Sequence, residues 1–274
     1  MKIFIDSADI DEIEYAYSSG VIDGVTTNPS LIKKAAEKRK QKDNKIDMSK
    51  YINRILKTAK GTPVSLEVTE FKYNGMVEQG KKLFKMFNPV AKNVYIKIPV
   101  NPSFEGEQGK EFEGIRAIKT LSQAGIPVNC TLIFTPEQAL LAAKAGARFV
   151  SPFAGRIDDY IRKSNSIAFD KSDYFPAMGW QAKNSVLQDN GIVSGIDLVA
   201  QIVEIFRRHN IRAEVLAASL RNTRQVREAA LAGAHIATLP FEVIKDLLSH
   251  YKTQEGMKSF TADIIPEYVS LTKR

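Results

Sequence analysis

The chain has 274 residues, of which 44% are hydrophobic and 26% are charged, and its formal net charge is +8. This composition is typical of a globular protein, and no apolar run approaches the roughly 20 residues that span a bilayer, so we expect no membrane segment. The single cysteine, Cys130, excludes an internal disulfide, and one cysteine with three histidines makes a structural zinc site a poor explanation. The acidic start, "MKIFIDSADIDEIE", lacks a secretory apolar region, so we expect a cytoplasmic protein without a targeting peptide.

Eight strand-like apolar runs recur along the chain, and helical patterns separate them. In chain order the runs are 2–6, 24–28, 64–68, 94–100, 127–133, 149–153, 213–219 and 235–240. Strands that alternate with helices imply a parallel sheet, and eight such units in roughly 250 residues match an α/β closed (β/α)8 TIM barrel. A doubly wound open sheet is the alternative. Because no low-complexity linker interrupts the chain, we predict one domain over 1–274.

Capping signals predict where several of the helices begin and end. Thr135 and Gln138 form a capping box around Pro136, and Gly146 is placed to end that helix. Further helix starts are predicted by the pairs Asp9 with Glu12, Ser194 with Asp197, and Asn222 with Gln225.

The positive net charge has three competing explanations: a nucleic-acid-binding surface, a site for an anionic metabolite, or an ordinary solvated surface. The densest basic stretch is "KKAAEKRKQKDNK" at 33–45, which has no aromatic residue and carries acids among its bases. That pattern favours a solvated helix or loop, and we expect no nucleic-acid partner.

Polar residues gather near the carboxyl ends of the predicted strands, where barrels of this class carry their chemistry. They are Asp6, Thr26, Asn28, Glu67, Lys97, Asn129, Thr131, Ser151 and Ser219, with Arg156 and Arg221 just beyond two strands. Residues two apart share a face of a strand, so Asn129 and Thr131 are predicted to point together and Cys130 the opposite way. Singly, such residues are usually satisfied structural groups. Together they indicate a proton-transfer site around a nucleophile.

A lysine interrupts the apolar run "NVYIKIPV" at 93–100. Because an unpaired charge is costly away from water, Lys97 either reaches solvent at an edge or faces the barrel axis while Ile96 and Ile98 face the helices. In a water-poor barrel its charged form is disfavoured, and a free amine can attack a ketone to form a Schiff base. Arg156 and Arg221 are either surface groups or a fork-like anion site.

At these residues the chain resembles the transaldolase family of Schiff-base aldolases. The matching segments follow the family's order: "FIDSAD" (4–9), "GVTTNPSLI" (24–32), "SLEV" (65–68), "YIKIP" (95–99), "NCTLIF" (129–134), "SPFAGRI" (151–157) and "LAASLRNTRQ" (216–225). The resemblance implies a catalytic group of Lys97, Asp6, Glu67 and Thr131. It implies a substrate-binding group of Asn28, Thr26, Asn129, Ser151 and Phe153. It also implies a phosphate-binding group of Arg156, Arg221 and Ser219.

The reaction that the resemblance implies is transfer of a dihydroxyacetone unit in the pentose phosphate pathway. The donor is sedoheptulose 7-phosphate or fructose 6-phosphate, and the acceptor is glyceraldehyde 3-phosphate or erythrose 4-phosphate. Lys97 attacks the C2 carbonyl, Glu67 and Thr131 assist loss of hydroxide through a water, and Asp6 takes the C4 hydroxyl proton as the C3–C4 bond breaks. No cofactor or metal is expected, because the iminium ion acts as the electron sink.

Two alternatives remain. The sister family, fructose-6-phosphate aldolase, carries glutamine at the position of Glu67 and tyrosine at that of Phe153, so these two residues and Asn129 favour transfer over release of the unit. A non-catalytic basic binding protein that kept the barrel is the other alternative, and the net charge motivates it.

The chain departs from the family pattern in several segments. We predict a long loop insertion after the sixth strand, at 157–193, whose aromatic residues form a lid, a subunit contact or a plain packing cluster. Residues 33–50 and 101–112 also look unusual. The end, 256–274, is predicted to be a helical tail, because its apolar residues recur at helical spacing: Met257, Phe260, Ile264, Ile265 and Tyr268. It covers the barrel mouth, docks on its own barrel or contacts a second subunit, so a homo-oligomer is one expectation.

Overall fold

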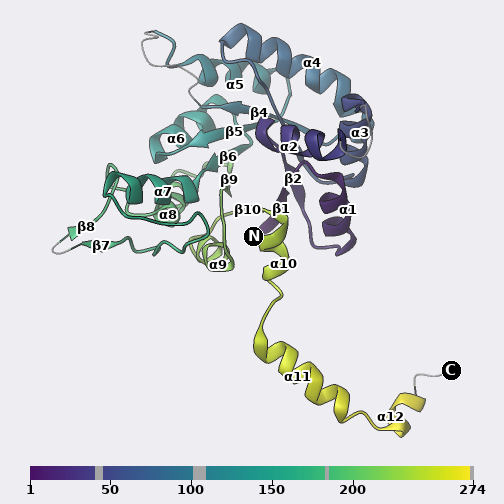
Figure 1. Ribbon diagram of the computed structural model, residues 1–274. Coiled ribbons are helices and arrows are strands. Elements are labelled where there is room, and N and C mark those ends of the chain that lie inside the picture. Colours follow the sequence, from purple (N-terminus) through teal and green to yellow (C-terminus); the bar gives the residue numbers. More distant parts are fainter. Residues whose placement is uncertain (41–45, 101–108, 183–184, 272–274) are drawn as a thin grey trace.

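Eight parallel strands close into a barrel in the computed structural model, which describes residues 1–40, 46–100, 109–182 and 185–271 (Figure 1). The strands are β1 (Lys2–Asp6), β2 (Gly24–Thr26), β3 (Val64–Glu67), β4 (Val94–Pro99), β5 (Val128–Ile133), β6 (Phe149–Pro152), β9 (Glu214–Ala217) and β10 (Ile236–Leu239). They follow chain order around the barrel, and β10 pairs with β1 to close it. The predicted (β/α)8 barrel is therefore confirmed, and the open-sheet alternative is wrong.

Helices surround the barrel and alternate with its strands (Figure 1). They are α1 (Ile10–Ser18), α2 (Pro29–Lys40), α3 (Met48–Thr58), α4 (Tyr73–Ala91), α5 (Glu113–Gln123), α6 (Pro136–Ala145), α7 (Ala154–Ser164), α8 (Gly195–Arg208), α9 (Thr223–Leu231), α10 (Phe241–Asp246), α11 (Tyr251–Ala262) and α12 (Pro266–Ser270). No helix in the described ranges is both long enough and apolar enough to cross a membrane.

The predicted helix caps are confirmed by hydrogen bonds. Thr135 and Gln138 form the capping box of α6, and Gly146 ends that helix at a φ of 100°, a left-handed conformation that suits glycine. Side chains also cap three other helices at the predicted residues: Asp9 for α1, Ser194 for α8 and Asn222 for α9. These short-range signals fix where these four helices begin and where α6 ends.

Aromatic and aliphatic side chains fill the interior of the barrel below its polar end. The Tyr95 ring stacks on Phe149 with 4.7 Å between centroids, and Phe4 meets Phe149 edge-on at 6.0 Å. Gly24 leaves the room that Phe4 needs, because a Cβ at Gly24 would lie 2.6 Å from the Phe4 ring. Since Lys97 follows Tyr95 by two residues on β4, it lies on the same face, above this dry aromatic layer.

The predicted insertion at 157–193 is only partly a loop. Residues 157–164 belong to α7, which begins at Ala154 and continues to Ser164. The prediction that the loop starts at 157 is therefore wrong, because helical hydrogen bonding continues through these residues. The remainder includes β7 (Gln181–Ala182) and β8 (Ser185–Val186), a short antiparallel pair, while 183–184 lie outside the described residues. Phe175 is 1% exposed and packs against the main core, with its ring 6.1 Å from Trp180. Phe175 thus anchors this segment on the barrel, while Tyr160 and Trp180 stay exposed.

The C-terminal helices α11 and α12 extend away from the barrel (Figure 1). Apolar side chains of these helices and of the turn between them are exposed in this chain: Met257 60%, Phe260 73%, Ile264 54%, Ile265 56% and Tyr268 69%. The tail is helical as predicted, but in its described part, up to residue 271, it neither covers the barrel mouth nor docks on its own barrel. The other unusual stretches, 33–50 and 101–112, fall outside the described residues at 41–45 and 101–108.

Candidate active site

Lys97 points into the barrel. On β4 it is in register with Glu67 of β3 and Asn129 of β5, and it is 4% exposed. Its Nζ lies 3.3 Å from Glu67 Oε2 and donates a hydrogen bond to the carbonyl oxygen of Thr27 at 3.1 Å. The interpretation of Lys97 as an edge residue that reaches solvent is therefore wrong. The barrel instead holds an amine beside a carboxylate, where water has little access.

A cavity of about 90 Å³ opens beside this amine. Most of the residues selected from the strand ends line it: Asp6, Thr26, Asn28, Lys97, Ser151, Phe153, Arg156 and Ser219. Asn28 also caps α2, because its Oδ1 accepts a hydrogen bond from the Leu31 amide at 3.0 Å. The barrel thus brings these residues, from five of its strands or the turns after them, to one small space.

Two carboxyl groups flank the amine, and both are shifted by burial. Burial raises the pKa of Asp6, and the Lys97 cation and a 2.7 Å hydrogen bond from Thr26 Oγ1 partly oppose that rise. Burial also raises the pKa of Glu67, again opposed by Lys97, while the charge of Asp6 adds to the rise. A carboxylate whose pKa lies above its ordinary range takes up a proton more readily at neutral pH, which suits it to proton transfer.

A buried amide and hydroxyl chain lies on the other side of Lys97. Ser151 Oγ donates to Asn129 Oδ1 at 2.7 Å, and Asn129 Nδ2 donates to Ser65 Oγ at 3.1 Å. Thr131 is 1% exposed, and its Oγ1 makes no hydrogen bond with any described residue. The register of β5 against β6 shifts at this point, and Leu132 has a φ of 60°. Buried polar atoms are nearly always hydrogen-bonded, so the Thr131 hydroxyl is a candidate to bind an oxygen of a ligand or of water.

The predicted phosphate-binding residues do not all meet in the cavity. Arg156 and Ser219 line it, and the Arg156 guanidinium lies 4.8 Å from the Phe153 ring centroid. Ser219 adopts a left-handed φ of 61°, a conformation that costs energy for a residue with a Cβ. Arg221 lies outside the lining, because its guanidinium forms an ion pair with Asp159. The two arginines therefore do not converge on one anion site in this structure, since Arg156 lines the cavity and Arg221 is paired with Asp159.

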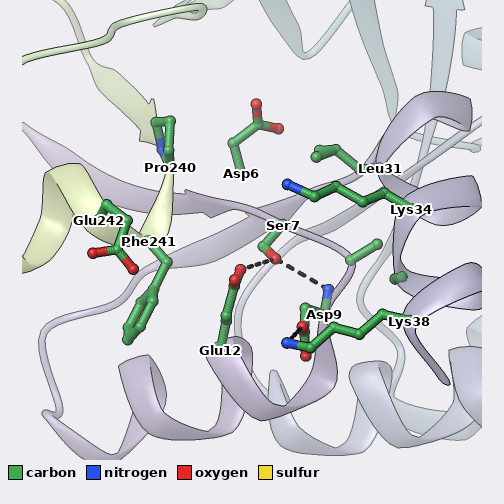
Figure 2. Close-up of a pocket in the computed structure, with 12 residues that line it drawn as sticks. Asp6, Ser7, Asp9, Glu12, Leu31, Lys34, Lys38, Pro240, Phe241 and Glu242 are labelled. Atoms are coloured by element: carbon green, nitrogen blue, oxygen red, sulfur yellow. Dashed lines mark hydrogen bonds and ion pairs between the residues drawn. The ribbon is translucent and has the colours of Figure 1, made fainter. Parts of the chain in front are cut away.

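A larger cavity of about 310 Å³ adjoins the site and also has Asp6 in its lining (Figure 2). Lys34 of α2 extends into it toward Asp6, while Lys38 forms an ion pair with Asp9 (Figure 2). Asp6 therefore lines both cavities. In the described ranges no group of three or more His, Cys, Asp or Glu side chains is arranged to hold a metal ion.

Sequence reasoning missed three contributors to the site. Thr238 lines the cavity, and its hydroxyl lies 2.5 Å from that of Thr26; its position near the end of the last predicted strand was the available signal. Ser65 supports Asn129, and it stands two residues before Glu67, on the same face of β3. The Thr27 carbonyl that accepts from Lys97 leaves no signal in a sequence, because every residue carries a carbonyl.

The chain matches a family model and several known proteins over nearly its whole length. The family model described as Transaldolase/Fructose-6-phosphate aldolase matches residues 3–272. A "probable transaldolase" of Thermoplasma acidophilum is 40% identical over 263 residues, which cover 96% of this chain and 95% of that protein. A "probable transaldolase" of Geobacillus thermodenitrificans is 37% identical over 263 residues, with 96% and 98% covered.

Among solved structures, a lactate oxidase of Pediococcus acidilactici aligns with a TM-score of 0.50 and 13% sequence identity. The match covers 89% of this chain and 64% of the oxidase, and at that identity it shows a shared fold alone. The full-length match to the family model and the relatives near 40% identity carry more weight. The chain belongs to the transaldolase/fructose-6-phosphate aldolase family.

Proposed function

We propose that this chain is a transferase that moves a dihydroxyacetone unit from a ketose phosphate to an aldose phosphate through a Schiff base on Lys97. The observation that carries the proposal is the buried Lys97 amine, 3.3 Å from Glu67 and in one cavity with Asp6. The donor is sedoheptulose 7-phosphate or fructose 6-phosphate, and the acceptor is glyceraldehyde 3-phosphate or erythrose 4-phosphate. The relatives named "probable transaldolase" support transfer as the reaction type.

The first half of the proposed reaction forms and uses the iminium ion. The Lys97 nitrogen adds to C2 of the ketose, and the new C2 hydroxyl leaves as water after it receives a proton from Glu67, with Thr131 binding that water. Asp6 then takes the proton of the C4 hydroxyl. The electrons of the C3–C4 bond move into the iminium ion, so an enamine stays on Lys97 and an aldose phosphate is released.

The second half reverses these steps with a different aldose phosphate. The enamine carbon attacks the aldehyde, Asp6 returns its proton to the new hydroxyl, and water releases the ketose from Lys97. Asn129, Ser151, Asn28, Thr26 and Phe153 hold the carbon chain in this proposal. Arg156, Ser219 and Arg221 hold the phosphate, because guanidinium groups match the geometry and charge of a phosphate.

Transfer is favoured over simple release, because Glu67 and Phe153 stand where the sister aldolases carry glutamine and tyrosine. The test is incubation with fructose 6-phosphate, with and without erythrose 4-phosphate, while ketose products and free dihydroxyacetone are both measured. We expect a seven-carbon ketose phosphate only when the acceptor is present. Without the acceptor, free dihydroxyacetone should form at least about 100-fold more slowly than that ketose phosphate forms with it, the scale of one lost proton-transfer contribution.

Two other outcomes would contradict the proposal. Free dihydroxyacetone formed equally fast without acceptor would identify a lyase of the sister type. Absence of both reactions, together with salt-sensitive retention on RNA, would support the non-catalytic basic binding protein. The described part of the basic stretch argues against the latter, since Lys38 pairs with Asp9 and Lys33 lies 3.9 Å from Glu37, as on an ordinary solvated helix.

A cytoplasmic location is part of the same proposal. The thiol of Cys130 is free and buried in the core between the barrel and its helices. A chain that relies on no disulfide suits a reducing compartment.

We also propose that the C-terminal tail packs on a second copy of the chain. A helix of twelve residues is marginal in water when nothing packs against it, and α11 exposes its apolar residues in the isolated chain. Burying Phe260 and the neighbouring Ile264 on another subunit would remove this exposed apolar surface from water.

Replacing two apolar tail residues is therefore expected to dissociate the assembly. In sedimentation velocity, the unmodified chain should sediment as an oligomer and the variant Phe260→Ser with Ile264→Ser as a smaller species. Lys258→Ser, which changes an exposed polar residue of the same helix, is the matched control and should leave the assembly intact. A monomeric unmodified chain at micromolar concentration would contradict this part of the proposal.

A further inference from the structure

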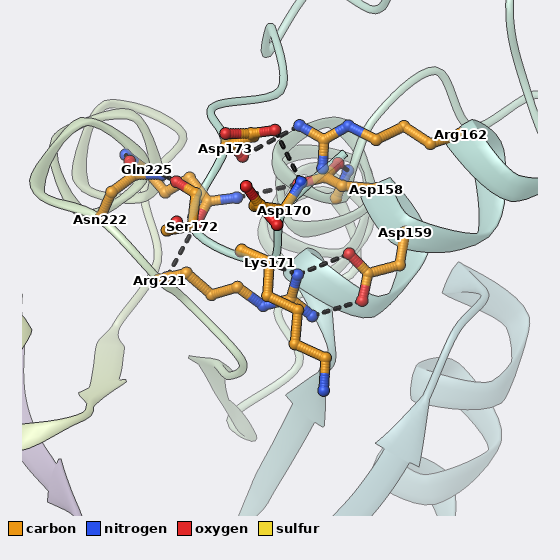
Figure 3. Close-up of polar contacts among 11 residues, drawn as sticks. Asp158, Asp159, Arg162, Asp170, Lys171, Ser172, Asp173, Arg221, Asn222 and Gln225 are labelled. Atoms are coloured by element: carbon orange, nitrogen blue, oxygen red, sulfur yellow. Dashed lines mark hydrogen bonds and ion pairs between the residues drawn. The ribbon is translucent and has the colours of Figure 1, made fainter. Parts of the chain in front are cut away.

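Arg221 is held at the rim of the site by a carboxylate that the sequence analysis did not select. Asp159 Oδ1 and Oδ2 accept hydrogen bonds from the two terminal nitrogens of Arg221 at 2.5 and 2.6 Å (Figure 3). The two side chains are only 17% and 15% exposed. A two-pronged pair of this kind, largely shielded from water, is among the stronger ion pairs in proteins, and it neutralises the guanidinium charge.

The segment after α7 also holds this arginine in place. The carbonyl oxygen of Lys171 accepts a second hydrogen bond from the same Arg221 nitrogen that reaches Asp159 Oδ1, at 3.1 Å (Figure 3). The segment is itself anchored to α7, because Arg162 donates to the Asp173 carbonyl oxygen at 2.9 Å, and to α9, because the Tyr174 hydroxyl donates to Glu228 at 2.6 Å. Arg221 is thus held in this orientation by three acceptors.

This ion pair lies directly beside the proposed phosphate site. A Cβ on Gly155 would lie 3.0 Å from Arg221 Nε and 2.3 Å from the Ser219 carbonyl oxygen, so Arg221 runs against the first turn of α7. Arg156, the next residue, lines the cavity with Ser219, and Asp159 follows Arg156 by three residues on the same helix. A phosphate bound near Arg156 would therefore lie close to Arg221, whose guanidinium is already paired with Asp159.

We propose that Asp159 competes with the substrate phosphate for Arg221 and thereby weakens phosphate binding. This inference rests on the proposed transfer reaction. In that reaction an aldose phosphate must leave the site and another must enter while the carbon unit remains on Lys97. A phosphate group that both arginines held without competition would dissociate slowly. Such uniform tight binding of the departing product would also add nothing to the chemical step. Asp159 supplies the competition as a fixed internal anion.

The test measures binding of inorganic phosphate to the full-length protein by calorimetry, with inhibition of turnover by phosphate as a second readout. Asp159→Asn is expected to lower the dissociation constant and the inhibition constant for phosphate about five- to tenfold, the scale of one partly shielded charge pair. KM for the ketose phosphate should fall with them. Asp170→Asn is the matched control: it removes the same charge from a nearby exposed position that is not among the three acceptors of Arg221, and should change either constant less than about twofold.

The dependence on Arg221 separates this role from a merely structural one. In an Arg221→Gln background, Asp159→Asn should no longer improve phosphate binding, because the released partner is absent. Unchanged or weaker phosphate binding by Asp159→Asn in the natural background would overturn the inference, and so would an equal improvement in both backgrounds. If Asp159→Asn does not fold, Asp159→Ser carries the same expectation.

Failure of this inference and failure of the proposed function give different results. Calorimetry needs no turnover, so phosphate binding can be compared even if no ketose phosphate is processed. Normal transfer activity with an unimproved Asp159→Asn would reject only the role of Asp159. Absence of transfer by the natural chain would reject the proposed function, whatever the result of the phosphate-binding measurement.

Discussion

Lys97→Met is expected to lower transfer activity by about 10⁴-fold or more, the scale seen when a covalent nucleophile is removed. Methionine nearly matches the length of lysine but has no amine to attack C2. Glu67 would lose the nearby cation that opposes the rise of its pKa, so it would bind a proton and leave no unpaired buried charge. The measurement is turnover of fructose 6-phosphate with erythrose 4-phosphate, together with borohydride trapping and mass spectrometry of the peptide that contains position 97.

Lys85→Met is the matched control for this variant. Lys85 lies exposed on α4, so the same substitution there should leave both turnover and the trapped adduct unchanged. A sugar adduct that persists in Lys97→Met, or maps to another lysine of the natural chain, would contradict the assignment of the nucleophile.

Asp6→Asn is expected to separate formation of the Schiff base from cleavage of the carbon–carbon bond. Turnover should fall about 10²- to 10⁴-fold, the typical contribution of one general base, because an amide cannot take the C4 hydroxyl proton. Lys97 lies 3.3 Å from Glu67, and in the proposed mechanism these two residues, and not Asp6, carry out the first addition. Borohydride should therefore trap more of the intact six-carbon adduct on this variant than on the natural chain.

The pH profile gives the same prediction a second readout. The base must be ionised to act, and burial raises the pKa of Asp6, so kcat should fall on acidification at a pH above the ordinary range of an aspartate. The residual activity of Asp6→Asn should lack that acid limb. Asp246→Asn, at an exposed position of α10, is the control and should keep the natural profile. Natural turnover in Asp6→Asn, or loss of the trapped adduct, would rule out the proposed base.

The sequence predicted the barrel because its signals act over a few residues. Apolar runs, caps such as Thr135 and Asn222, and the glycine at 146 each fix local backbone geometry whatever the rest of the chain does. The two-residue alternation of a strand allowed Lys97 to face the barrel axis with Ile96 and Ile98 toward the helices, but it left an edge position open, and the structure decided between the two. The sequence did predict that the amine and the carboxyl groups lie near the same end of the barrel, because all eight parallel strands end there.

Only the tertiary structure decided which polar groups are engaged with one another. Thr26 and Thr238 meet across the closure of the barrel, and Arg221 meets Asp159 from a helix far earlier in the chain. Helix α11 extends away from the barrel (Figure 1), and the sequence could not predict this direction. Helical periodicity identifies the apolar side of a helix but not what packs against that side. The physical reason is the same in each case: hydrogen bonds and ion pairs depend on distances of a few ångströms between segments whose separation along the chain carries no information about their separation in space.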